Sequence, residues 1–149
     1  MRVRAVEVAD RGEWLRMRGF LWPEAAEAEH AADIDAFLRG PSEAELVLAV
    51  FVCERAPGGL CGFLELSVRS YAEGCTGAAP YVEGWYVDPD VRGQGIGRAL
   101  MEAAEQWARE RGYTELASDA ELENRASHEA HRALGFEEVE RAVHFRKAL

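Results

Sequence analysis

Cysteines, basic residues and long apolar runs are scarce in this sequence, and each scarcity excludes a class of protein. Its three cysteines, Cys53, Cys61 and Cys75, have no CxxC spacing, which argues against a disulfide framework and a thiolate metal site. No segment approaches the roughly 20 uninterrupted apolar residues that span a bilayer, and the first residues lack the apolar centre of a signal peptide. We therefore expect a cytoplasmic protein that binds neither a membrane nor a metal.

Acidic residues outnumber basic ones along the chain. Lys and Arg number 17 against 27 Asp and Glu, which gives a formal net charge of -10. This balance disfavours nucleic acid as a partner and suits a cationic ligand. Between Trp22 and Glu45 a single basic residue, Arg39, stands among seven acids. Such a run is either a solvated helix face or a surface that attracts cations.

Length and residue patterning predict one α/β (α+β) domain over residues 1–149. With 48% apolar residues, a chain of this length can fill one core. Hydrophobic periodicity and turn residues predict the elements and their order. They are a strand over 2–8, a helix capped by Asp10 and reaching Leu21, a helix over 25–38, strands over 46–53, 61–68 and 81–87, a helix from Gly95 that Gly112 ends, a strand over 115–118, a helix over 126–134 and a terminal strand pair over 136–147. We expect the first two helices to form a movable, acidic flap.

The clearest motif is VDPDVRGQGIGRAL, from Val87 to Leu100, which combines a strand, a proline stop, a glycine-rich turn and an amphipathic helix. Glycines let a backbone approach a phosphate closely, and the N-terminus of a helix carries a partial positive charge. Backbone N–H groups from Gln94 to Gly97 would converge on such an anion. Arg92 and Arg98 would add charge-assisted hydrogen bonds.

Two common phosphate-binding loops do not match this turn. A nucleoside triphosphate loop needs Lys-Ser or Lys-Thr after the last glycine, and a dinucleotide loop needs a different glycine spacing. The turn instead resembles the acetyl-CoA pyrophosphate loop of the GCN5-related N-acetyltransferase (GNAT) superfamily, whose Arg-x-x-Gly-x-Gly core is matched by Arg92, Gly95 and Gly97. The order of elements resembles this superfamily as well, including the helix-to-strand junction at 133–136.

The resemblance implies a fold, a cosubstrate and a set of binding residues. The fold is a central mixed, mostly antiparallel twisted sheet flanked by helices, and the cosubstrate is acetyl-CoA. The residues implied to bind it are Val87, Arg92, Gly93, Gln94, Gly95, Ile96, Gly97, Arg98 and Asn124.

Within this superfamily the chain is similar to the aminoglycoside 6'-N-acetyltransferases. The similar segments lie at 21–23, 70–71, 74–75, 82–84, 117–119, 123–124 and 134–138. By this resemblance, Trp22, Tyr71, Glu83 and Asp119 line the acceptor pocket. A polycationic aminosugar needs converging carboxylates and an apolar plane, so we expect both acids on strands and without a partner. Salt bridges to nearby arginines are the alternative for the acids, and core packing is the alternative for the aromatics.

The resemblance also implies direct acetyl transfer in a ternary complex. Glu83 is the expected general base, directly or through a water, and Asp119 is the alternative base or an anion that orients the amine. A backbone N–H near Val87 would stabilise the thioester oxygen. His131 stands where the superfamily usually has Tyr, and it either protonates the leaving CoA sulfur or hydrogen-bonds the cofactor. Sequence spacing gives Ser118 no nucleophile arrangement.

Two other functions stay open on sequence alone. The first is a GNAT enzyme for another small amine, a polyamine or a protein terminus, since a fold does not fix a substrate. The second is an acyl-CoA-binding module without turnover. The superfamily resemblance further implies a homodimer.

Overall fold

The computed structural model of this chain describes residues 1–40 and 47–149. Two acids of the predicted flap, Glu43 and Glu45, lie outside the described residues. In chain order the elements are β1 (Val3–Ala5), the 3-10 turn η1 (Val8–Asp10), α1 (Arg11–Leu21), α2 (Glu27–Leu38), β2 (Ala49–Glu54), β3 (Leu60–Arg69), β4 (Ala79–Val87), the 3-10 turn η2 (Pro89–Val91), α3 (Ile96–Glu110), β5 (Ala117–Ser118) and α4 (Arg125–Ala133). Within the described ranges, no helix is long and apolar enough to cross a membrane.

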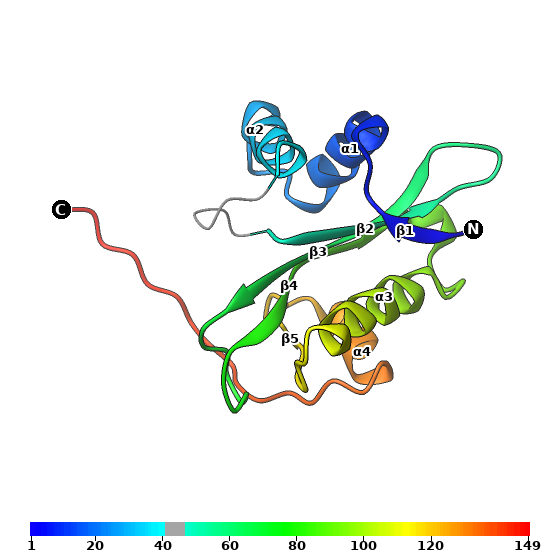
Figure 1. Cartoon of the computed structure of the whole chain (residues 1–149). Coiled ribbons are helices and arrows are strands. Elements are labelled where there is room, and N and C mark those ends of the chain that lie inside the picture. The colour runs from blue at the N-terminus through cyan, green and yellow to red at the C-terminus, as the bar shows by residue number, and fades with distance from the viewer. Residues whose placement is uncertain (41–46) are drawn as a thin grey trace.

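A five-stranded sheet in the order β1-β2-β3-β4-β5 forms the centre of the molecule. The first four strands pair antiparallel, and β5 joins β4 in parallel. Helices α1 and α2 cover one face of the sheet, and α3 and α4 cover the other (Figure 1). The mixed, mostly antiparallel sheet flanked by helices that the sequence predicts is confirmed.

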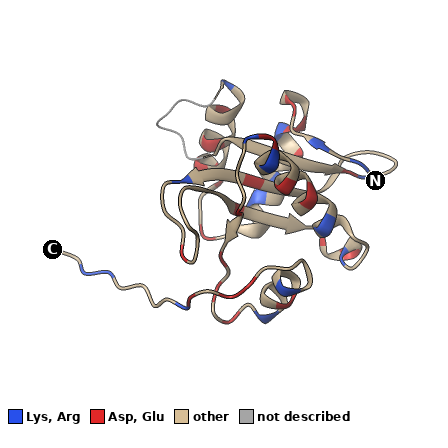
Figure 2. Ribbon diagram, turned by 60° about the horizontal axis from the view of Figure 1, so that its bottom comes forward, with Lys and Arg blue, Asp and Glu red and all other residues tan. Residues whose placement is uncertain are grey.

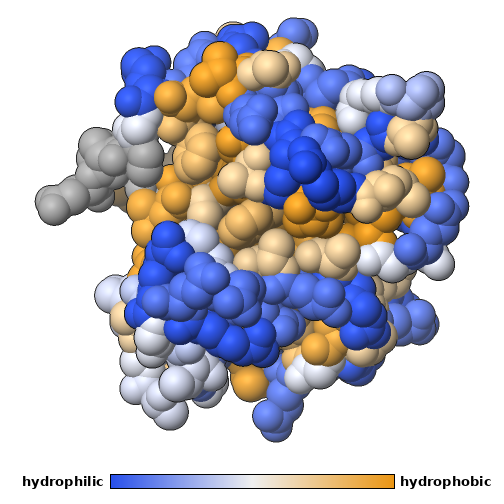
Figure 3. All heavy atoms as spheres, turned by 45° about the vertical axis from the view of Figure 1, so that its right-hand side comes forward, coloured by the Kyte–Doolittle hydropathy of each residue, from blue (hydrophilic) through white to orange (hydrophobic). Residues whose placement is uncertain are grey.

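Strand β3 is buried on both faces and joins two hydrophobic cores. On one face Leu64 belongs to the cluster that contains Leu100 of α3, and on the other Phe63 belongs to the cluster that contains Trp14 of α1. Side chains alternate between the faces of a strand, so neighbouring residues of β3 enter different cores. In Figure 3 the exposed part of this apolar interior appears as a hydrophobic band between hydrophilic layers.

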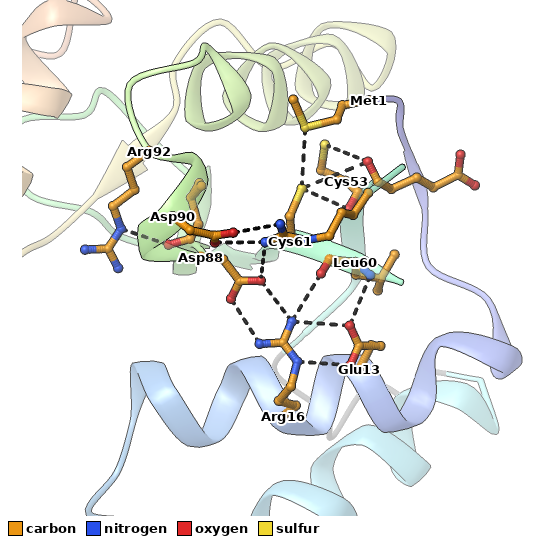
Figure 4. Close-up of polar contacts among 12 residues, drawn as sticks. Met1, Glu13, Arg16, Cys53, Leu60, Cys61, Asp88, Asp90 and Arg92 are labelled. Carbon is orange, nitrogen blue, oxygen red and sulfur yellow. Dashed lines mark hydrogen bonds and ion pairs between the residues drawn. The ribbon is translucent and has the colours of Figure 1, made fainter. Parts of the chain in front are cut away.

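Arg16 ties α1 to the end of β4. Its guanidinium donates two hydrogen bonds of 3.0 Å to the Asp88 carboxylate and one of 3.1 Å to the Leu60 carbonyl oxygen (Figure 4). Burial raises the pKa of Asp88, but hydrogen bonds from Arg16 and Arg55 outweigh it and bring the pKa below its ordinary value. These contacts fix the point at which the chain leaves the sheet for the glycine-rich turn.

The two N-terminal helices differ in detail from the prediction. Asp10 does precede α1, but its carboxylate accepts hydrogen bonds from Arg4 and from the backbone N–H of Glu7 instead of capping that helix. Helix α2 begins two residues later than predicted, at Glu27, and buries His30 on its inner side. The beginning of an amphipathic helix is weakly specified by periodicity alone.

Two acids of the predicted acidic flap are paired with α1. Asp33 accepts a hydrogen bond of 3.0 Å from Arg18, and Asp35 accepts two, of 2.7 and 3.0 Å, from Arg11. The charge run is therefore partly a set of contacts between the two helices. Its mobility stays a prediction.

The predicted terminal strand pair over 136–147 is wrong for this chain. These residues form no strand: the first of them line a cavity beside α4, and only the end of the segment runs away from the body of the molecule (Figure 1). Phe145 is 93% exposed and Val143 is 70% exposed. A strand needs a neighbouring strand for its backbone N–H and C=O groups, and within the described residues of a single copy this segment pairs with no strand.

Candidate active site

The glycine-rich turn before α3 has the backbone geometry of an anion site. Gly93 and Gly95 adopt φ values of 78° and 84°, a left-handed region that glycine enters without steric cost. Gly95 is the N-cap of α3 and brings no side chain to its first turn, where backbone N–H groups have no intrahelical partner. Gly93, Gln94 and Gly95 are all exposed.

Both arginines of the turn are exposed and anchored at one end. Arg92 Nε donates a 2.8 Å hydrogen bond to the carbonyl oxygen of Val87 (Figure 4). Arg98 reaches the carbonyl oxygen of Ala133 at 3.4 Å, which connects the start of α3 to the end of α4. Each has further N–H groups in its guanidinium that can meet a phosphate.

Two other residues of the predicted cofactor set have structural constraints. The Ile96 side chain is buried in the core under α3, so only its backbone can meet a ligand. A Cβ at Gly97 would lie 3.1 Å from the ring of Trp85, and Trp85 Nε1 donates a 3.1 Å hydrogen bond to the Gly97 carbonyl oxygen. Glycine at this position lets α3 lie close to β4.

Asn124 is the N-cap of α4. Its side-chain oxygen accepts a 3.1 Å hydrogen bond from the backbone N–H of Ser127. The oxygen is therefore occupied by the helix, and the amide nitrogen is the group left for a cofactor contact.

A β-bulge places Glu83 beside the open edge of β4. Glu65 of β3 pairs with Gly84 and Leu66 pairs with Val82, so Glu83 is an extra residue of β4 with no partner in the register. On its other side β4 pairs with β5 only at Tyr81 and Val82. The two strands thus part at Glu83, four residues before Val87.

Glu83 is not an unpaired carboxylate, which corrects the prediction. Arg69 donates two hydrogen bonds to it, of 2.9 and 2.8 Å, and the Ser67 hydroxyl donates one of 2.6 Å. The side chain of Glu83 is 14% exposed. Burial of a carboxylate at this depth requires such partners, and Arg69, four residues after Glu65 on β3, supplies the charge.

Asp119 also has a partner, and it follows β5 instead of lying on it. The Tyr81 hydroxyl donates a 2.6 Å hydrogen bond to its carboxylate. Burial raises the pKa of Tyr81, and the bond to Asp119 raises it further. The guanidinium carbon of Arg69 lies 3.6 Å from the centroid of the Tyr81 ring. Arg69 and Tyr81 therefore join Glu83 and Asp119 into one polar network.

The two predicted aromatics lie in different environments. Trp22 follows the last residue of α1, and its ring packs against β4 so closely that a Cβ at Gly84 would lie 2.6 Å from it. Trp22 also packs against the core around Phe63. Core packing, the alternative role for this aromatic, therefore applies to the side of the ring that faces the core. Tyr71 is 68% exposed, and its hydroxyl donates a 2.8 Å hydrogen bond to Glu73.

A buried ion pair under Trp22 escaped the sequence analysis. Glu65 is 1% exposed, lies 3.1 Å from Arg18, and accepts a 3.2 Å hydrogen bond from Trp14 Nε1. Burial raises the pKa of Glu65 to about 7, although Arg18 acts in the opposite direction. Arg18 also reaches Asp33 and lies 5.0 Å from the Trp22 ring centroid. The sequence signal for this pair was Glu65, the one acidic residue in a mostly apolar strand.

A cavity of ≈ 660 Å³ opens beside this network. Arg69, Tyr81, Ser118, Asp119 and His131 line it together with the segment that follows α4. Seven carboxylates face it against three arginines, and Figure 2 shows acids along the chain around α4. The seven are Glu73, Asp119, Glu121, Glu123, Glu137, Glu138 and Glu140. Such a lining favours a polycationic ligand.

His131 of α4 contacts residues of both β4 and β5. Its ring lies edge-on to Trp85 of β4, with centroids 5.2 Å apart. Ser118 Oγ lies 2.8 Å from Nε2, and the Ser127 carbonyl oxygen lies 2.7 Å from Nδ1. Within the described residues, no group of three or more His, Cys, Asp or Glu has the geometry to hold a metal ion.

Comparison with known proteins gives consistent matches over the whole chain. The acetyltransferase (GNAT) family model matches residues 12–136. An aminoglycoside N(6')-acetyltransferase type 1 of Klebsiella aerogenes is 49% identical over 148 residues, covering 99% of this chain and 96% of that protein. One of the same name from Stenotrophomonas maltophilia is 41% identical over 150 residues, covering 99% and 93%. The solved structure of AAC(6')-Iy in complex with the bisubstrate analogue CoA-S-monomethyl-acetylneamine is similar at a TM-score of 0.87 and 33% identity, covering 99% and 98%.

We predict that Glu65 makes folding stability depend on pH. Because its pKa rises from 4.5 to about 7 in the folded protein, the folded state binds more protons than the unfolded state in this window. The free energy of unfolding therefore falls as pH increases from about 4.5 to 7, by on the order of 1–3 kcal/mol relative to Glu65→Gln. Urea unfolding of both proteins across this range measures the difference.

Glu102→Gln, at an exposed position of α3, is the control and should give a curve parallel to that of the wild type. A wild type that gains stability over Glu65→Gln with rising pH would show that the ion pair with Arg18 outweighs burial.

Proposed function

The chain belongs to the acetyltransferase (GNAT) family, and from this we propose that it is an aminoglycoside 6'-N-acetyltransferase that uses acetyl-CoA. It transfers the acetyl group to the 6'-amine by direct transfer in a ternary complex, and the modification confers resistance to the antibiotic. The observation that carries this proposal is the acid-lined cavity, which opens where β4 and β5 diverge. Because β4 also leads into the glycine-rich turn, one strand connects the cavity with the turn.

The cofactor half of the site consists mainly of backbone groups. The turn from Arg92 to Arg98 would bind the pyrophosphate through the first N–H groups of α3 and the two guanidinium groups. Asn124 would add an amide contact, and a backbone N–H at Val87 would meet the thioester oxygen. When bound, acetyl-CoA supplies the activated acetyl group. These assignments agree with the exposure of the turn.

The acceptor half attracts and orients a cation. The seven carboxylates of the cavity lining favour a ligand with several ammonium groups. Trp22 and Tyr71 are not among the residues that line this cavity, and they would offer apolar planes to sugar rings that extend beyond it. Asp119, which is exposed just after β5, would hold an ammonium group near the gap between the strands.

Glu83 is the proposed general base. An amine attacks a thioester only after it loses a proton, because the neutral form is the nucleophile. Glu83 lies where β4 parts from β5, and hydrogen bonds from Arg69 and Ser67 orient its carboxylate. Three hydrogen bonds to the two oxygens leave an acceptor position on Oε2, where a water would pass the proton to the carboxylate.

The proposed assembly is a cytoplasmic homodimer. The free cysteines Cys53, Cys61 and Cys75 suit a reducing compartment. The exposed apolar residues Val143 and Phe145 lie on the segment after α4, which forms no strand within the described residues of one copy. This supports pairing of that segment with a second chain.

Truncation tests the dimer. A chain ending at residue 138 should elute as a monomer and the full chain as a dimer, as measured by size-exclusion chromatography with light scattering. Substitution of Phe145 by Ser should weaken the dimer in the full chain. A dimer that survives the truncation would place the interface elsewhere.

The substrate assignment is tested by thiol release from acetyl-CoA. We expect turnover with kanamycin-type aminoglycosides that carry a 6'-amine, and none with analogues that carry a 6'-hydroxyl. Spermidine, a polyamine, tests the alternative that this chain is a GNAT enzyme that acetylates another small amine. Turnover on spermidine alone would keep the acetyltransferase and remove the antibiotic as its substrate.

Glu83→Gln tests the base. Glutamine keeps the size and accepts hydrogen bonds from Arg69 and Ser67, but it cannot take a proton. We expect kcat to fall by about 10² to 10⁴ while the Kd for acetyl-CoA, from calorimetry, stays unchanged. Glu102→Gln is the matched control at an exposed position of α3. Full activity of Glu83→Gln would make Asp119 the next candidate.

A further inference from the structure

His131 occupies the gap where β4 and β5 part, and its ring is held in one orientation. Trp85 of β4 and Phe136 after α4 each lie edge-on to the imidazole with centroids 5.2 Å apart. Hydrogen bonds hold both ring nitrogens, through Ser118 on one side and Ser127 on the other. A histidine that merely fills space would not need this double restraint.

The contacts determine which nitrogen exchanges a proton. Nδ1 lies 2.7 Å from the Ser127 carbonyl oxygen, and a carbonyl oxygen accepts hydrogen bonds but cannot donate them. Nδ1 therefore carries a hydrogen in both charge states of His131. Nε2 is the nitrogen that gains or loses a proton, and Ser118 Oγ lies 2.8 Å from it. A hydroxyl can accept from Nε2–H and donate onward at the same time.

Ser118 and His131 lie between the two halves of the site. Both line the acidic cavity with Asp119. On the other side His131 contacts Trp85, whose indole nitrogen binds Gly97 at the start of α3. On these contacts we place the path of a bound CoA chain, from the glycine-rich turn to the cavity, past this pair. Its sulfur, the atom that joins CoA to the acetyl group, would then lie on the Ser118 side.

We infer that Ser118 and His131 form a proton relay that protonates the leaving CoA sulfur. As the C–S bond breaks, the Ser118 hydroxyl gives its proton to sulfur and takes one from Nε2 of the His131 imidazolium. The products are the CoA thiol and a neutral imidazole, and solvent in the cavity restores the imidazolium. The proton of the attacking amine leaves separately, toward Glu83. This inference rests on the proposed function, and it makes Ser118 a catalytic residue and Ser127 a positioning residue.

The same geometry has a second chemical use that the experiment must separate from the first. With a neutral His131, Ser118 is a nucleophile beside a base. It would then attack the thioester carbonyl, pass its proton through Nε2 to the thiolate, and form an acetyl ester. The relay leaves Ser118 unmodified, so the two uses differ in a stable product.

The test is single-turnover acetyl transfer by Ser118→Ala, His131→Gln and the double variant, with a 6'-amine aminoglycoside that the wild type turns over. We expect each single variant to be slower by about 10². The loss is no larger because a thiolate, whose thiol has a pKa of about 8.5, can leave without full protonation. The double variant should be no slower than the singles, and Ser118→Thr should restore the rate. Glu102→Gln, at an exposed position of α3 outside the cavity lining, is the control.

A second acyl donor distinguishes the relay from a structural role. The oxygen-ester analogue of acetyl-CoA releases an alkoxide, which is a stronger base than a thiolate, so the loss at Ser118→Ala should be larger with this donor. Equal losses with both donors, losses that multiply in the double variant, or acetyl-Ser118 in the mass spectrum would each overturn the relay. A wild type without activity on any amine would instead remove the proposed function.

Discussion

One extra residue in β4 determines how the parts of the candidate active site are arranged. Opposite Glu65, β4 contains Glu83 in addition to Gly84, and the register shifts by one. A bulge of this kind bends its strand and increases the local twist. β5 follows β4 only as far as Val82, so among the described strands none covers that edge from Glu83 to Val87. The glycine-rich turn lies beyond one end of this edge, and the acidic cavity lies at the other.

Arginines connect elements that the acid-rich sequence would otherwise hold apart. Arg16 joins α1 to Asp88 at the end of β4, and Arg18 joins the same helix to β3 and α2. Arg69 joins β3 to Glu83 in the bulge. A planar guanidinium donates in several directions at once, which suits it to bridging carboxylates from different elements. The acids that pair with Arg16 and Arg18 position helices, whereas most acids of the cavity lining remain available to bind a ligand.

Features with a strong local pattern were predictable from the sequence. The hairpin of β2 and β3 and the helix from Ile96 to Glu110 are confirmed to within a few residues. The terminal strand pair was not predictable in the same way, because alternating residues specify a strand only when a neighbour completes its hydrogen bonds. The sequence predicted Glu83 and Asp119 as site residues but did not identify their hydrogen-bond partners. Arg69 lies 14 residues from Glu83, and only the register of β3 and β4 brings the two together.

The sequence by itself determined the glycine-rich turn, the amphipathic helix after it, the acidic charge and the family resemblance, because each depends on residues within a few positions of one another. Only the tertiary structure decided that Glu83 is paired, that Glu65 is buried beside Arg18, and that Ser118 meets His131. These contacts depend on strand register and helix placement. A shift of one residue in a strand turns every side chain to the opposite face, and no local pattern records that choice.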